Sequence, residues 1–197
     1  MDDGYIKFNC KRVRDKPIQI QRLIEINNLR DKLYGLKLVG ASSDGVGFGN
    51  ISMKLENNEF IITGLATGNF SKLDGNHYAL VNDYDFSKNS LTCKGPINAS
   101  SESLSHAMIY ECLLDTKAVI HIHNLEMWEK LKDKMPTTRE DVSYGTPEMA
   151  EEIKRLFRES NVSDKKIIVM GGRREGIIFF GRTLDEAEEV LLKYFND

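Results

Sequence analysis

Residues 95–124, GPINASSESLSHAMIYECLLDTKAVIHIHN, decide the fold and carry most of the candidate chemistry. The tripeptide Ser-Ser-Glu at 100–102 stands where a loop turns into a helix, because apolar residues follow it at helical spacing. Residues 118–123, AVIHIH, are apolar and largely β-branched, which predicts a short buried strand. Side chains alternate between the two faces of a strand, so His121 and His123 should point to the same face.

Length and composition exclude several classes of protein. The 197 residues suit one domain with a substantial core, and a net charge of −3 gives no electrostatic reason to expect nucleic acid or an anionic membrane as a partner. No apolar run approaches the roughly 20 residues that span a bilayer, and the N-terminal stretch lacks the apolar segment of a signal peptide. Three cysteines at unrelated spacings argue against a disulfide framework. We therefore expect a cytoplasmic protein with reduced thiols.

The pattern along the chain predicts an α/β fold. Residues 1–16 are polar and rather basic, which indicates a solvated arm or an edge strand, and residues 17–197 should form a single domain. Because strands at hairpin distance alternate with helices, the sheet should be mixed and largely antiparallel. Strands are expected over residues 51–55, 60–63, 78–81, 90–94, 118–123, 166–170 and 177–180, and helices over 18–38, 125–134, 148–159 and 184–195, besides the helix that follows residue 102.

The paired histidines are a candidate metal site. Two imidazoles on one strand face can hold a divalent ion, and His121 and His123 are two of only four histidines in the chain. A catalytic site of this kind needs three protein ligands and an open position, and the spacing supplies only two. The residues alone therefore leave open a metal site and a pair of ordinary core histidines.

The residues at the start of the central helix also allow two interpretations. Glu102 either favours the positive end of the helix dipole or acts as a general base towards a substrate. Ser100 and Ser101 either cap the helix or, with its free N–H groups, bind a phosphate. Taken singly, the glycine-containing loops around Asn50 and around Thr67-Gly68 are best explained as turns.

Together these segments resemble the class II aldolase/adducin family, which includes L-fuculose-1-phosphate aldolase and L-ribulose-5-phosphate 4-epimerase. The resemblance runs in order from about residue 20 to the C-terminus. It rests on five matches: GNIS at 49–52, ITGLATG at 62–68, SSE with His106 and Ile109-Tyr110 after it, AVIHIH at 118–123, and GRTLDEA at 181–187.

The resemblance implies a three-layer α/β/α sandwich and usually a homotetramer. It implies that Glu102 is the acid/base and that His121 and His123 are zinc ligands. The substrate phosphate would be held by Asn50, Thr67, Gly68, Ser100 and Ser101.

Two departures from the family pattern affect the expected chemistry. The third zinc ligand of the family is a histidine in an HG dipeptide, and the matching position here is Glu175, followed by Gly176. Glutamate is a competent ligand, so zinc is favoured, with manganese or iron as alternatives. The segment between His123 and Tyr144 is shorter than in the sugar-phosphate aldolases and lacks the region that supplies their catalytic tyrosine.

We therefore predict a divalent-metal-dependent lyase that acts on a phosphorylated hydroxyketone or sugar phosphate, with epimerisation or dehydration as related possibilities. Glu102 would be the acid/base, and His121, His123 and Glu175 would hold the metal. The alternative is a binding or structural protein of the same fold that has lost its catalytic metal.

Overall fold

The structure is a computed structural model that describes residues 5–43 and 45–196. Its centre is an eight-stranded sheet with the order β1-β7-β6-β5-β4-β8-β10-β9. Only the edge pair β1 and β7 is parallel, so the expectation of a mixed, largely antiparallel sheet is confirmed. The strands are β1 (Asn9–Val13), β4 (Asn50–Lys54), β5 (Phe60–Thr63), β6 (Tyr78–Asp85), β7 (Ser90–Lys94), β8 (Ala118–His123), β9 (Ile167–Val169) and β10 (Gly176–Gly181), and a separate ribbon pairs β2 (Gly40–Ala41) with β3 (Gly47–Phe48).

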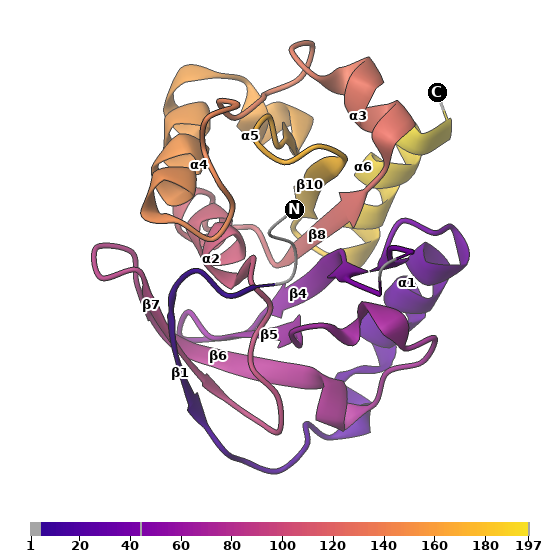
Figure 1. The fold of residues 1–197 in the computed structure, drawn as a ribbon, viewed down its shortest axis with the longest axis vertical. Coiled ribbons are helices and arrows are strands. Elements are labelled where there is room, and N and C mark those ends of the chain that lie inside the picture. The colour runs from indigo at the N-terminus through magenta and orange to yellow at the C-terminus, as the bar shows by residue number, and fades with distance from the viewer. Residues whose placement is uncertain (1–4, 44, 197) are drawn as a thin grey trace.

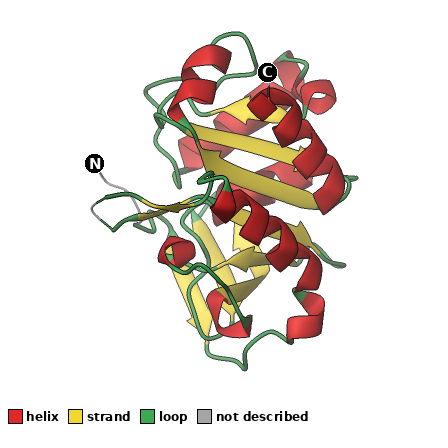
Figure 2. Ribbon diagram, turned by 90° about the vertical axis from the view of Figure 1, so that its right-hand side faces the viewer, coloured by secondary structure: helices red, strands yellow, loops and turns green. Residues whose placement is uncertain are grey.

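Helices cover both faces of the sheet, which gives the predicted three-layer sandwich (Figure 1). One face carries α2 (Ser103–Cys112), α4 (Pro147–Glu159) and the single turn α5 (Val162–Lys165). The other carries α1 (Ile24–Gly35), α3 (Leu125–Leu131) and α6 (Leu184–Asn196), and in Figure 2 helices of this side lie in front of the strands. Within the described residues, no helix is long and apolar enough to cross a membrane.

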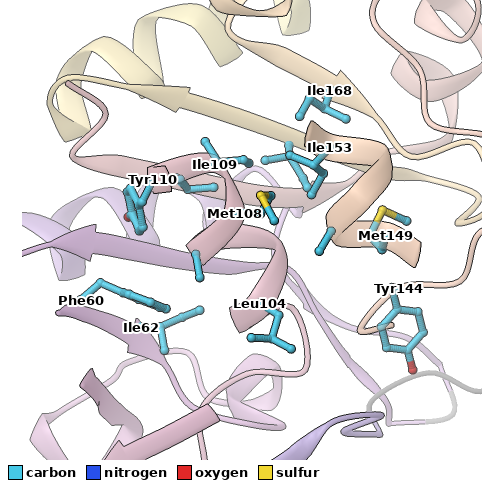
Figure 3. Packing of buried hydrophobic residues seen from close by; sticks show 14 of the residues in the cluster. Phe60, Ile62, Leu104, Met108, Ile109, Tyr110, Tyr144, Met149, Ile153 and Ile168 are labelled. Carbon is cyan, nitrogen blue, oxygen red and sulfur yellow. The ribbon is translucent and has the colours of Figure 1, made fainter. Parts of the chain in front are cut away.

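The alternation of side chains along the strands explains the two separate cores. In β8, Val119 packs against the α2 and α4 layer, whereas Ile120 and Ile122 pack against the α1, α3 and α6 layer. Figure 3 shows the first of these cores, in which Met108 of α2 lies between its own helix and Ile153 of α4. Each large apolar side chain that is fully buried in this way contributes about 1.5–3 kcal/mol by its removal from water.

This arrangement places both candidate ligands of β8 on the α2 side of the sheet. The ring centroids of His121 and His123 lie 5.1 Å apart, so the prediction that they share a face is confirmed. Asn50 of β4 is the direct cross-strand partner of His121. The centre of the sheet therefore brings three polar side chains to the start of α2, where burial among apolar strands fixes their directions.

Most elements lie within a few residues of their expected positions, and the differences have local causes. The helix expected from residue 18 begins only at Ile24, after a short 3-10 helix, Ile20–Arg22. Part of the N-terminal stretch, Asn9–Val13, is an edge strand of the main sheet rather than a solvated arm. The loop expected between residues 42 and 50 ends in β3, whose two residues pair with β2.

Candidate active site

One pocket gathers most of the residues that the sequence singles out. It is formed where the loop before β4, the loop after β5, the start of α2 and the strand β8 meet. The structure therefore brings together candidates that lie on segments far apart in the chain. The predicted residues that line it are Asn50, Thr67, Gly68, Ser100, Ser101, Glu102 and His121, together with Arg173, which the sequence motifs do not single out.

The Thr67-Gly68 loop can adopt its shape only with glycine at position 68. A Cβ atom on Gly68 would lie 1.9 Å from the carbonyl oxygen of Gly40, which is far too close for two non-bonded heavy atoms. Ala66, which precedes Thr67, has a left-handed backbone with φ of 57°, and the Thr67 hydroxyl donates to the carbonyl of Gly64 at 2.9 Å. Close backbone packing thus holds this loop against β2 and turns it towards the pocket.

A buried arginine supports the same loop from behind. Arg30 of α1 is only 3% exposed, and its guanidinium donates to the carbonyl of Ser71 at 3.0 Å and, more weakly, to those of Thr67 and Gly68, both at 3.5 Å. Burial lowers the pKa of Arg30, but its ordinary value is so high that the group stays charged. Its charge therefore lies next to the loop and favours an anion there. The sequence pattern does not single out Arg30, because an arginine within an amphipathic helix carries no signal of burial.

Ser100, Ser101 and Glu102 form the entry to α2. Glu102 occupies the position before the first helical residue, is 1% exposed, and accepts a hydrogen bond from the Ser105 hydroxyl at 3.0 Å. The Glu102 N–H approaches the Ser100 hydroxyl at 3.4 Å, and the Ser103 hydroxyl donates to the Ser100 carbonyl at 2.6 Å. The positive end of the helix dipole lies here, so negative charge is favoured both on Glu102 and on a bound anion.

Two of the histidines near this entry are buried and have different surroundings. The hydroxyl of Ser52 lies 2.7 Å from Nδ1 of His106 and 2.6 Å from the Tyr110 hydroxyl, so His106 belongs to the polar contacts between β4 and α2. His121 lies 1% exposed beside Asn50, whose side-chain amide nitrogen is 3.3 Å from Nδ1 of His121. Its Nε2 has no hydrogen-bond partner among the described residues. Burial, together with the charge of nearby groups, holds the pKa of His121 well below its ordinary value, so the ring is neutral.

His123, one of the predicted metal ligands, contacts an arginine through its Nε2 atom. Nε of Arg173 donates to Nε2 of His123 at 3.2 Å, and it lies 3.9 Å from Oε1 of Glu102. The guanidinium also lies 4.2 Å from the ring centroid of Tyr144, and Arg173 is only 8% exposed. Burial and then the Arg173 charge lower the pKa of His123 to about 3, so this ring is also neutral.

The turn between β9 and β10 explains why Arg173 enters the site and Glu175 does not. The Gly176 N–H donates to the carbonyl of Arg173 at 3.0 Å, which places Glu175 at the third position of a tight turn with φ of 76°. Backbone of this kind usually takes glycine, so a glutamate here is strained. The Glu175 side chain is 44% exposed, and its Oε2 lies 3.9 Å from Nδ1 of His123, the nitrogen opposite the one that Arg173 binds.

The three predicted metal ligands therefore do not converge. Within the described residues, no group of three histidine, cysteine, aspartate or glutamate side chains is placed to hold a metal ion. The lone pair of His123 Nε2 is engaged by a guanidinium, and a permanent positive charge stands where a cation would have to bind. In this arrangement the donor set does not fit a divalent ion.

Comparisons with known proteins agree with the fold. The family model described as the class II aldolase and adducin N-terminal domain matches residues 34–193. L-fuculose-1-phosphate aldolase from Thermus thermophilus is similar in structure, with a TM-score of 0.57 and 18% identity over 86% of this chain and 84% of that one. YgbL from Klebsiella pneumoniae, a putative aldolase/epimerase/decarboxylase, gives a TM-score of 0.64 and 15% identity over 89% of this chain and 86% of that one. A search of curated proteins finds no significant match.

Proposed function

This chain belongs to the class II aldolase and adducin family, and on that premise we propose that it is an aldolase-type lyase. Its substrate would be a small phosphorylated hydroxyketone or sugar phosphate, and a related epimerase or dehydratase step would use the same residues. The observation that carries the proposal is the single pocket in which the five candidate phosphate-binding residues surround the buried Glu102.

The phosphate end of the pocket supports an anionic ligand. The hydroxyl-bearing residues Thr67, Ser100 and Ser101 and the amide-bearing Asn50 line it, and each is less than a tenth exposed. The start of α2 and the guanidinium of Arg30 add positive potential. A phosphate held here would anchor the substrate and leave its carbonyl end to reach Glu102, which is how binding energy is converted into orientation.

Glu102 is the residue that would move the proton. In aldol cleavage a hydroxyl loses its proton, the adjacent C–C bond breaks, and the electron pair passes to the carbonyl oxygen to give an enolate. The proton is then returned at carbon. A carboxylate within the pocket serves as acceptor and donor in such steps, and the Ser105 hydroxyl holds one of its oxygens in place.

The family implies a divalent ion, most often zinc, that would polarise the substrate carbonyl. Of the ligands proposed from the sequence, His121 offers a buried nitrogen without a partner among the described residues, but His123 is bound by Arg173 and Glu175 faces outward. These residues, as they are placed here, therefore do not fit the ion. We keep as proposals a cytoplasmic location and a homo-oligomer, a tetramer by analogy with the family.

The proposal is tested with dihydroxyacetone phosphate, the simplest phosphorylated hydroxyketone. In deuterated water, proton NMR should show loss of one hydrogen on the carbon that bears the free hydroxyl. Replacing Glu102→Gln should slow this exchange by about 10²–10⁴-fold, since it removes the base, while phosphate binding persists. Glu111→Gln, on the exposed far end of the same helix, is the matched control and should exchange like the wild type. Exchange by Glu102→Gln at the wild-type rate would refute the role of Glu102, and no exchange by the wild type would favour a retired site.

A further inference from the structure

Arg173 places a positively charged side chain in the candidate active-site pocket. We infer that the guanidinium of Arg173, rather than a bound divalent ion, binds the reactive oxygens of the substrate, so that the site takes a small phosphorylated acid or enediolate without any metal. The inference rests on the proposed function only for the phosphate end of the pocket.

The position of Arg173 is the first argument. The side chain is 8% exposed although it belongs to a loop, and it lines the same pocket as Glu102 and His121. Of the described residues, three lie against it: His123 accepts from its Nε at 3.2 Å, the Glu102 carboxylate lies 3.9 Å away, and the Tyr144 ring stacks at 4.2 Å. A buried arginine is retained only where such partners offset its loss of water, so the site is built around this charge.

Two of the predicted metal ligands, His123 and Glu175, are also poorly placed to bind a metal ion. A metal bound by His123 would need the Nε2 lone pair that Arg173 already uses, and would stand beside a permanent positive charge. The strained backbone of Glu175 directs its carboxylate to the opposite side of the His123 ring, at 3.9 Å from Nδ1. Both features come from the tight turn between β9 and β10. This turn directs the Arg173 guanidinium into the pocket and keeps the Glu175 carboxylate on the far side of the His123 ring.

The geometry of a guanidinium indicates the ligand. Its planar, forked donors match two oxygens in one plane, as in a carboxylate or a cis-enediolate, better than a single oxygen. His121 supplies a second group: with the Asn50 amide donating to its Nδ1, the neutral ring carries its proton on Nε2, which is buried without a partner among the described residues. That N–H is available to a ligand oxygen. A two-carbon or three-carbon chain with a phosphate at one end and paired oxygens at the other therefore suits this site.

The experiment compares two ligands in metal-free, chelator-treated protein by calorimetry. Phosphoglycolate carries both a phosphate and a carboxylate, whereas inorganic phosphate reports on the phosphate end alone. Replacing Arg173→Gln should weaken phosphoglycolate binding at least about tenfold, because a charged hydrogen bond is lost, and should change phosphate binding less than about threefold. Arg174→Gln is the matched control, since that neighbouring arginine is exposed and pairs with Glu129 at 3.5 Å.

Each result is informative. Tighter binding of phosphoglycolate than of phosphate without metal, lost in Arg173→Gln and kept in Arg174→Gln, would support the inference. Equal phosphoglycolate affinity in wild type and Arg173→Gln would overturn it, as would wild-type binding that appears only after zinc is added. Absence of phosphate binding in the wild type would instead refute the phosphate site of the proposed function, while the zinc dependence of phosphoglycolate binding would still decide the role of Arg173.

Discussion

The two ends of the pocket differ in how they match the family pattern. At the proposed phosphate end, every residue expected from the motifs lines the pocket, and close packing such as that of Gly68 against Gly40 holds the loops in place. At the other end the two histidines of β8 lie as expected, but Arg173 donates to Nε2 of His123, and the partly exposed Glu175 lies on the Nδ1 side of the same ring. One end therefore matches the residues proposed to hold a phosphate, while the other has a guanidinium beside the predicted metal ligands.

This difference shows which part of a site a motif can specify. The loops proposed to hold the phosphate depend on glycine and on backbone shape, and these are visible as residue types at fixed spacing. The cation end depends on one tight turn between β9 and β10, whose residues decide which side chain points inward. The position where the family has a histidine ligand is Glu175 here, and the same turn places the positive charge of Arg173 in the pocket.

The largest effect is expected when the phosphate end is broken. Gly68→Ala places a methyl group against the Gly40 carbonyl, so the loop must shift, which should cost about 1–3 kcal/mol of unfolding free energy and remove measurable phosphate binding. Thermal unfolding and phosphate calorimetry measure both effects. The Arg173 contact with His123 should persist, because it belongs to the other end of the pocket.

Gly35→Ala is the matched control for this substitution. Gly35 ends α1, and a methyl group there would meet no atom within 4 Å, so stability should stay the same or rise slightly. If Gly68→Ala bound phosphate as well as Gly35→Ala does, the Thr67-Gly68 loop would have no part in the site.

A smaller effect on stability is expected at Glu186, which lies in a motif of the family but away from the pocket. Glu186 of the closing GRTLDEA motif pairs with Lys166 at 2.5 Å and accepts from the Arg182 N–H at 2.5 Å, which lowers its pKa from an ordinary value of 4.5 to about 2. A lowered folded-state pKa stabilises the fold above pH 4.5, and this stability is lost as the pH falls towards 2. Because the group is partly exposed, Glu186→Gln should cost at most about 1 kcal/mol.

Urea unfolding of wild type and Glu186→Gln at pH 7 and at pH 3 checks this effect. The difference between the two proteins should shrink at the lower pH, and phosphate affinity at pH 7 should not change. A loss of phosphate affinity in Glu186→Gln would mean that the closing motif contributes to the site.

Much of the fold can be predicted from the sequence, because the apolar periodicity is strong where elements are buried on a face. The continuous apolar runs of β8 and β10, and the cap of α4 by Thr146 before Pro147, place those elements within one residue or so of where they lie. The edge strand β1 could be predicted only as one of two alternatives, since its burial alternates weakly and its partner strand lies about 80 residues away.

The site is predictable only in part, for a physical reason. Residues that act through backbone shape or through position on a strand, such as Gly68 and His121, carry a local signal. Arg30 and Arg173 act by being buried, and burial of a charged side chain depends on partners elsewhere in the chain. The direction of the Glu175 side chain depends on a left-handed backbone angle. In a sequence such an angle can be expected at glycine, but not at glutamate.

The most direct test of this account is a zinc titration of the wild-type protein, followed by the ¹⁵N resonances of the His121 and His123 rings. Because Arg173 engages Nε2 of His123 and no third ligand is in place among the described residues, both rings should keep their neutral, metal-free shifts when zinc is added. A change of the ring-nitrogen shifts of both histidines, saturating at one zinc ion per chain, would contradict the account and restore the metal-dependent mechanism.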